Sequence, residues 1–182
     1  MRDTGPKVVL GIDPGTAVTG YGIVRKEGRN PLILVECGVI RTKPRDPLAQ
    51  RLAEIHEGIV DLIRRHSPNV LSIEDIFYAR NVRTTVVLGH ARGVIQLAGA
   101  QAGMEIHEYP PSEIKKSVAG TGAATKLQVQ FMVARLLRLK SAPQPTDAAD
   151  GVAAALCYAL APDLPHIQSI PRELIVRAGL NS

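Results

Sequence analysis

Hydrophobic and polar positions along the chain fall into two kinds of pattern, which together predict five strands and five helices. A short apolar run bounded by turn residues is typical of a strand inside a sheet, whereas apolar residues three or four apart are typical of a helix with one buried face. The short links between the first three strands favour an antiparallel meander. We predict strands over 8–12, 19–25, 32–42, 70–74 and 104–109, and helices over 47–66, 84–102, 111–118, 126–139 and 147–160.

Three short polar segments mark where elements begin or turn. Asp46 followed by Pro47 is typical of a helix start, with Asp as the N-cap and Pro at the first helical position. Thr125 and Gln128 have the spacing of a capping box, which predicts a helix start at residue 126. Asp13-Pro14-Gly15-Thr16 breaks the first strand, and Pro and Gly at its second and third positions fit a type II turn.

The order of these elements, β-β-β-α-β-α-β-α-α-α, predicts an α/β fold with a mixed five-stranded sheet flanked by helices. A length of 182 residues suits one domain with a single sizeable core. Beyond Pro162 the sequence loses clear periodicity. We therefore predict one domain over residues 1–162 and a surface tail over residues 163–182.

The charge balance adds a preference for anionic partners. The chain carries 22 Lys and Arg against 17 Asp and Glu, which gives a net charge of +5 and a pI near 9.5. A basic protein of this size favours a partner such as nucleic acid, but charge alone does not establish one.

The sequence lacks the features of an exported or membrane-spanning protein. Its N-terminus is polar, without the apolar core of a signal peptide, and no apolar run reaches the roughly 18–20 residues that span a bilayer. Cys37 and Cys157 lie in apolar contexts without metal-ligand spacing, which favours two buried, reduced thiols. We therefore expect a cytoplasmic protein with no membrane contact.

Two acidic residues stand at the ends of apolar strands. Asp13 follows the first strand and Glu74 ends the fourth, which should lie beside the first. Asp13 taken alone is also explained as a turn former, because Asp favours such positions. Two carboxylates at the ends of neighbouring central strands, however, repel each other unless a cation or a proton lies between them.

Asp147 and Asp150 are three residues apart at the start of the last predicted helix, so that their side chains share a face. For either residue alone, a favourable interaction with the helix dipole is a sufficient explanation. Together with Asp13 and Glu74 they form a four-carboxylate set, which suits Mg²⁺ or Mn²⁺. Two such ions about 3.5–4 Å apart can activate water and stabilise the leaving oxygen in phosphodiester hydrolysis.

Six segments of the chain, in register from about residue 8 to 160, resemble the RuvC family of bacterial Holliday junction resolvases. Any one of them is a weak signal, but six in order are a specific one. The segments are Gly11-Ile12-Asp13-Pro14-Gly15 with Thr19-Gly20-Tyr21-Gly22, Ser72-Ile73-Glu74-Asp75-Ile76-Phe77, Gly89-His90-Ala91-Arg92-Gly93-Val94, Ile114-Lys115-Lys116-Ser117-Val118-Ala119-Gly120, Lys126-Leu127-Gln128-Val129-Gln130 and Asp147-Ala148-Ala149-Asp150.

The resemblance implies a ribonuclease-H-like fold, a homodimer and a structure-selective endonuclease that resolves four-way DNA junctions by paired symmetric nicks in recombination and DNA repair. It also implies the RuvA–RuvB branch-migration complex as a partner. It places the catalytic, metal-binding acids at Asp13, Glu74, Asp147 and Asp150. Some members of the family have His at the position of Asp147. Asp75 should point to the opposite face of its strand and is left out of the site.

The resemblance assigns DNA contacts and charge stabilisation at the scissile phosphate to Lys115 and Lys126. Each would otherwise be explained as a solvated surface lysine. Phe77 follows the Glu74 strand, and the family implies that it stacks on bases at the junction; the alternative is a core anchor for its loop. Arg80 and Arg83 are weaker candidates for nearby phosphates. The small residues of the helix over 84–102 make it our candidate for the dimer interface.

Three other functions fit part of the pattern. Asp13-Pro14-Gly15-Thr16 resembles the phosphate-binding hairpin of sugar kinases and actin-like ATPases, although those proteins need two such domains. A catalytically silent junction-binding module would gain from losing acids near phosphates, so the four intact acids argue against it. A nuclease of the same fold with another substrate, such as RNA, is disfavoured by Phe77 and the later lysines.

Overall fold

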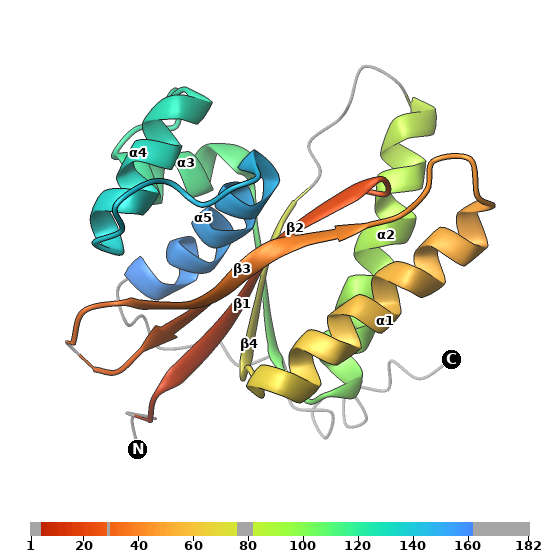
Figure 1. The fold of residues 1–182 in the computed structure, drawn as a ribbon, viewed down its shortest axis with the longest axis horizontal. Helices are drawn as coiled ribbons and strands as arrows, with labels where there is room; N and C mark the ends of the chain where they lie inside the picture. Colours follow the sequence, from red (N-terminus) through yellow and green to blue (C-terminus); the bar gives the residue numbers. More distant parts are fainter. Residues whose placement is uncertain (1–4, 29, 76–81, 162–182) are drawn as a thin grey trace, which may run out of the picture.

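The computed structural model of the protein describes residues 5–28, 30–75 and 82–161, and its ribbon is shown in Figure 1. It confirms the predicted order of five strands and five helices. The strands are β1 (Lys7–Asp13), β2 (Val18–Lys26), β3 (Ile33–Arg41), β4 (Val70–Glu74) and β5 (Glu105–Tyr109); the helices are α1 (Leu48–His66), α2 (Val82–Gln101), α3 (Pro111–Ala119), α4 (Lys126–Leu136) and α5 (Thr146–Leu160).

The five strands form one mixed sheet in the order β3-β2-β1-β4-β5. The opening meander is antiparallel, as predicted from its short links. β4 then pairs with β1 in parallel, and β5 pairs with β4 in parallel. β1 is therefore the central strand, which explains why its residues are apolar on both faces. The fold is the predicted α/β class.

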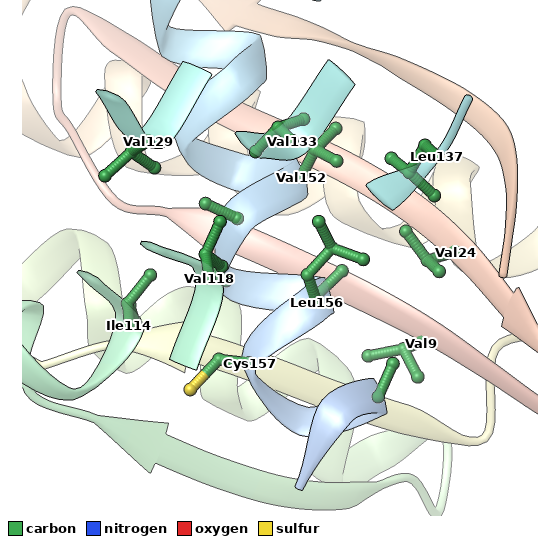
Figure 2. Packing of buried hydrophobic residues seen from close by; sticks show 14 of the residues in the cluster. Val9, Val24, Ile114, Val118, Val129, Val133, Leu137, Val152, Leu156 and Cys157 are labelled. Carbon is green, nitrogen blue, oxygen red and sulfur yellow. The ribbon is translucent and has the colours of Figure 1, made fainter. Parts of the chain in front are cut away.

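Helices cover both faces of this sheet (Figure 1). One layer contains α1 and α2, whose apolar faces pack on side chains such as Leu10, Ile23 and Ile73. The other contains α3, α4 and α5, whose packing around Val9 and Val24 is shown in Figure 2. Among the described residues, no helix combines the length and the apolar composition that crossing a lipid bilayer requires.

The local signals at helix starts succeed in one case and fail in another. The capping box at α4 is present, with the Thr125 and Gln128 side chains each bonded to the other residue's backbone N–H. Asp46 is not the N-cap of α1: the cap is Pro47, without a side-chain hydrogen bond. The helix therefore begins one residue later than predicted, and the backbone N–H of Asp46 donates to the carbonyl of Lys43 in the turn before it.

Two further expectations are corrected by backbone geometry. The helix predicted to reach residue 139 ends at Leu136, because Arg138 adopts a left-handed conformation with φ of 54°. Gly15 does not have the positive φ that a type II turn requires at its third position. Glycine is needed there for space, since a Cβ would lie 2.1 Å from the carbonyl oxygen of Val18.

Helix α5 packs unusually close to β1 and β2. A Cβ added to Gly11 would lie 2.2 Å from the backbone nitrogen of Ala155, and one added to Gly20 would lie 1.9 Å from the carbonyl oxygen of Asp147. From the helix side, a Cβ on Gly151 would lie 2.5 Å from the Cα of Tyr21. Backbone therefore lies against backbone at this interface, which fixes the height of α5 above the sheet.

Candidate active site

The register of the sheet brings two of the predicted acids together. Asp13 is the last residue of β1, and Glu74 is the last residue of β4. The parallel pairing of Ile12 with Ile73 places the following residues, Asp13 and Glu74, side by side at one edge of the sheet. Both side chains are partly buried, and both face the layer that contains α5.

Helix α5 brings the other two acids to the same edge. Carboxylate oxygens of Asp13, Asp147 and Asp150 all lie within 4.8 Å of one another. Because α5 begins at Thr146, Asp147 lies in its first turn and Asp150 one turn further on. The buried residues Ala148 and Ala149 between them pack into the core and turn the two carboxylates toward β1.

A cavity of about 250 Å³ is lined by three of the four acids and by the two predicted lysines. Its polar lining comes from Asp13, Glu74, Asp150, Lys115 and Lys126, and apolar side chains from α3, α4 and α5 complete it. The Nζ of Lys126 lies 2.6 Å from Oδ2 of Asp150. The structure therefore brings together residues from five separate elements, β1, β4, α3, α4 and α5.

The electrostatics of this cavity favour a bound cation. Burial first, and then the charges of Glu74 and Asp150, raise the pKa of Asp13 from 3.8 to about 7, although Lys126 acts in the opposite direction. Burial and Asp150 likewise raise the pKa of Glu74. The hydrogen bond with Asp150 raises the pKa of Lys126, so this ammonium stays charged. Lys126 and, at Glu74, also Lys115 offset the effect of the converging carboxylates only in part.

The donor set fits a hard divalent ion. It contains carboxylate oxygens close enough to share an ion, and cations such as Mg²⁺ and Mn²⁺ prefer such ligands. Burial is the main cause of the raised pKa of Asp13, and an ion between the acids would offset the repulsion that adds to it. Asp13, Asp147 and Asp150 are close enough to hold it together, and Glu74 lines the same cavity as Asp13 and Asp150.

We expect the metal-free protein to lose stability as the pH rises from about 4 to about 7. Asp13 has a pKa of about 7 when folded and one near 3.8 when unfolded, so the folded state binds the extra proton in this window and releases it above the window. The full difference corresponds to on the order of 4 kcal/mol. In EDTA, urea unfolding at pH 5 and pH 8 should show the part of this loss that falls above pH 5, roughly 3 kcal/mol, in the wild type and much less in Asp13→Asn. Equal pH slopes in the two proteins would contradict the prediction.

Of the three other residues predicted for the site, the structure describes one. Arg83 is exposed in the first turn of α2. Phe77 and Arg80 lie outside the described residues. Asp75, which was left out of the site, contacts Arg92 of α2 on the other side of the sheet, as its alternation with Glu74 predicted.

Sequence reasoning missed the residues that set the height of α5. Gly151 was not among the predicted site residues, yet its missing side chain allows the helix to approach β2. The signal was present in the closely spaced glycines Gly11, Gly20 and Gly22, which should have indicated a close partner above those strands. Thr19 was also overlooked: it is buried, and its hydroxyl donates to the carbonyl of Gly15 in the loop after Asp13.

Comparison with known proteins gives a consistent result for the whole described domain. Residues 9–158 match the family model described as crossover junction endodeoxyribonuclease RuvC. The RuvC protein of Pelotomaculum thermopropionicum is 49% identical over 152 residues, which cover 84% of this chain and 92% of the relative. The RuvC protein of Halorhodospira halophila is 49% identical over 151 residues, which cover 83% of this chain and 89% of that relative.

Solved structures agree with the sequence comparison. Thermus thermophilus RuvC in complex with a Holliday junction substrate is 34% identical, with a TM-score of 0.80, over 85% of this chain and 93% of the other. The yeast mitochondrial Holliday junction resolvase Ydc2 is 12% identical with a TM-score of 0.61, over 87% of this chain and 82% of the other, and shares the fold. The chain therefore belongs to the RuvC family of crossover junction endodeoxyribonucleases.

Proposed function

We propose that this protein is a structure-selective endonuclease that resolves four-way DNA junctions by paired symmetric nicks in recombination and DNA repair. The observation that carries the proposal is a carboxylate cluster of Asp13, Asp147 and Asp150. Two of these acids, Asp13 and Asp150, line one cavity with Glu74, Lys115 and Lys126. The similarity to a Thermus thermophilus RuvC that was solved with a Holliday junction substrate supports the choice of DNA.

The four acids would hold Mg²⁺ or Mn²⁺, and we propose two ions in each site. When bound, the ions would supply an activated water and stabilise charge on the leaving oxygen. The chain's own contribution is positional: Asp13 and Glu74 are held by the register of β1 and β4, and Asp147 and Asp150 by the packing of α5. Because these supports are rigid, the carboxylates are held in place before DNA arrives.

The two lysines would stabilise the negative charge of the phosphate. Lys126 is the first residue of α4, where free backbone N–H groups and the helix dipole also favour an anion. Lys115 lies in α3 on the same cavity, close enough to Glu74 to oppose the rise in its pKa. We propose that both neutralise charge on the scissile phosphate, with Lys126 exchanging its contact with Asp150 for one with DNA.

Selection of the junction and assembly are further parts of the proposal. We assign base stacking to Phe77 and phosphate contacts to Arg80 and Arg83. A homodimer would supply two sites, and α2 is the proposed contact because Val86 and Leu97 are exposed and Gly89 and Gly93 have open space around them. The RuvA–RuvB complex is the proposed partner. Free thiols at Cys37 and Cys157 support a cytoplasmic site of action.

The proposal can be tested with a supercoiled plasmid that extrudes a cruciform, incubated with the protein in Mg²⁺ or Mn²⁺. Paired nicks made in one binding event convert the plasmid directly to a linear form, and mapping of the ends should place the two cuts symmetrically. The same plasmid without the inverted repeat is the control. Equal cleavage of both plasmids, or single nicks alone, would contradict the junction-resolving function.

A further inference from the structure

Arg92 of α2 lies behind the strand that carries Glu74, on the opposite side of the sheet from the cavity. Its side chain is only 15% exposed, although it carries a permanent charge. One terminal nitrogen lies 2.9 Å from Oδ1 of Asp75, and the other bonds to Oε2 of Glu108. Its Nε is buried and has no hydrogen-bond partner among the residues that the structure describes.

These contacts join the ends of β4 and β5 next to Glu74. Successive side chains of a strand point to opposite faces, so Glu74 faces the cavity while Asp75 faces α2. Glu108 pairs with Ile73 in the parallel ladder of β4 and β5. The backbone N–H of Asp75 also donates to the carbonyl of Tyr109 at 2.8 Å. One guanidinium therefore links β4 and β5 next to Glu74.

The chemistry of arginine suits this position. A guanidinium presents its donors in a fixed planar fork, which holds two carboxylates at a defined separation, whereas a lysine ammonium offers a single point of charge. Without the guanidinium, Asp75 and Glu108 would face each other as like charges at the ends of adjacent strands. They would then spread the end of β4, the segment that determines where the Glu74 carboxylate lies.

We propose that Arg92 is a positioning residue for Glu74, which fixes the end of β4 from behind and so keeps the carboxylate at the metal-binding edge of the sheet. This role rests on the proposed function, in which Glu74 is a metal ligand. Arg92 itself does not line the cavity. It would act on Glu74 through its contact with Asp75, the next residue in the chain.

For Arg92→Gln, loss of charge and loss of positioning predict opposite changes in the affinity for a divalent cation. Arg92→Gln removes a cation near the acidic site, and through-space electrostatics alone would then tighten the binding of a divalent cation. Loss of positioning would instead weaken cation binding, because residues that orient metal ligands typically contribute about 10–100-fold to metal affinity. The sign of the change therefore separates the two effects.

The test is Mn²⁺ binding to the full chain without DNA, measured by the loss of the free-ion electron paramagnetic resonance signal. We expect Arg92→Gln to weaken Mn²⁺ binding roughly tenfold. The matched control is Arg64→Gln near the end of α1, where the arginine is 76% exposed and paired with Asp61. This helix precedes the start of β4, the opposite end of that strand from Glu74. Arg64→Gln should bind Mn²⁺ as the wild type does. Unchanged or tighter binding by Arg92→Gln would overturn the proposal.

Two further measurements distinguish a loss of positioning from unfolding of the variant. Arg92→Lys keeps the charge but not the fork, and it should bind Mn²⁺ more weakly than the wild type and more tightly than Arg92→Gln; wild-type affinity would overturn the proposal. In EDTA, the Asp75 amide should exchange its hydrogen faster in both variants. If the wild type binds no Mn²⁺, the proposed metal site fails. If the wild type and Arg92→Gln bind it equally, only the role of Arg92 fails.

Discussion

Asp13→Asn is expected to lower the rate of junction cleavage by about 10³-fold, because metal-ion stabilisation of the transition state is worth several kcal/mol. Asp13 is the residue most closely surrounded by the other acids: burial, Glu74 and Asp150 all raise its pKa. An amide has nearly the same shape but carries no charge, so an ion would lose a ligand while the fold is kept. The rate should be measured under single-turnover conditions at saturating Mg²⁺.

Junction binding is expected to survive this substitution. Removing a negative charge from a surface that faces phosphates should leave the affinity equal or slightly higher when it is measured in EDTA. The matched control is Asp61→Asn, at an aspartate on α1 that is paired with Arg64 and Arg65 away from the cavity. It should cleave at the wild-type rate. Persistent cleavage by Asp13→Asn would exclude Asp13 from the site, and loss of binding would show that the substitution damages the fold.

The parts of the site that depend on strand order could be predicted from the sequence. Apolar runs at 8–12 and 70–74 indicated two central strands, and an acid at the end of each therefore implied neighbouring carboxylates. The parallel register of β1 and β4 places Asp13 beside Glu74 in this way. The prediction succeeded because a buried strand has a strong hydrophobic signal and few alternatives for its position in the sheet.

The contact between two of the site's side chains and the exact start of α1 could not be predicted in the same way. The contact of Lys126 with Asp150 joins residues of two helices whose relative position is set by the core. Asp46 is not the cap because α1 begins one residue later than predicted, with Pro47 in the N-cap position. Thr125 succeeded as a cap because both of its partners lie within the same helical turn.

The closeness of α5 to the sheet is the structural property on which the site depends most strongly, and Gly151→Ala is designed to test it. A Cβ at residue 151 would lie 2.5 Å from the Cα of Tyr21 and 2.7 Å from the carbonyl carbon of Gly20. Both are backbone atoms of β2, which cannot rotate away. The helix must therefore rise from the sheet, and Asp150, the preceding residue, must move with it.

We expect Gly151→Ala to lower the cleavage rate by about 10²-fold, since a displacement of about 1 Å at a reacting centre can cost that much. Overpacking should also lower the free energy of unfolding by roughly 1–3 kcal/mol. Helix propensity alone predicts the opposite, a gain of about 1 kcal/mol for Ala over Gly. Single-turnover cleavage and urea unfolding of the same preparation would measure both quantities.

Gly58→Ala in α1 is the matched control for this substitution. A Cβ there would also lie within 3 Å of a neighbour, but the neighbouring atom is Cδ1 of Ile40, at 2.8 Å, the end of a flexible side chain. That side chain can adopt another rotamer, so activity should be kept and stability should change little. If Gly151→Ala proved as active and as stable as Gly58→Ala, the position of Asp150 would not depend on backbone contact between α5 and β2. The acids would then have to be held by their own side-chain contacts, of which the ion pair with Lys126 is the strongest candidate.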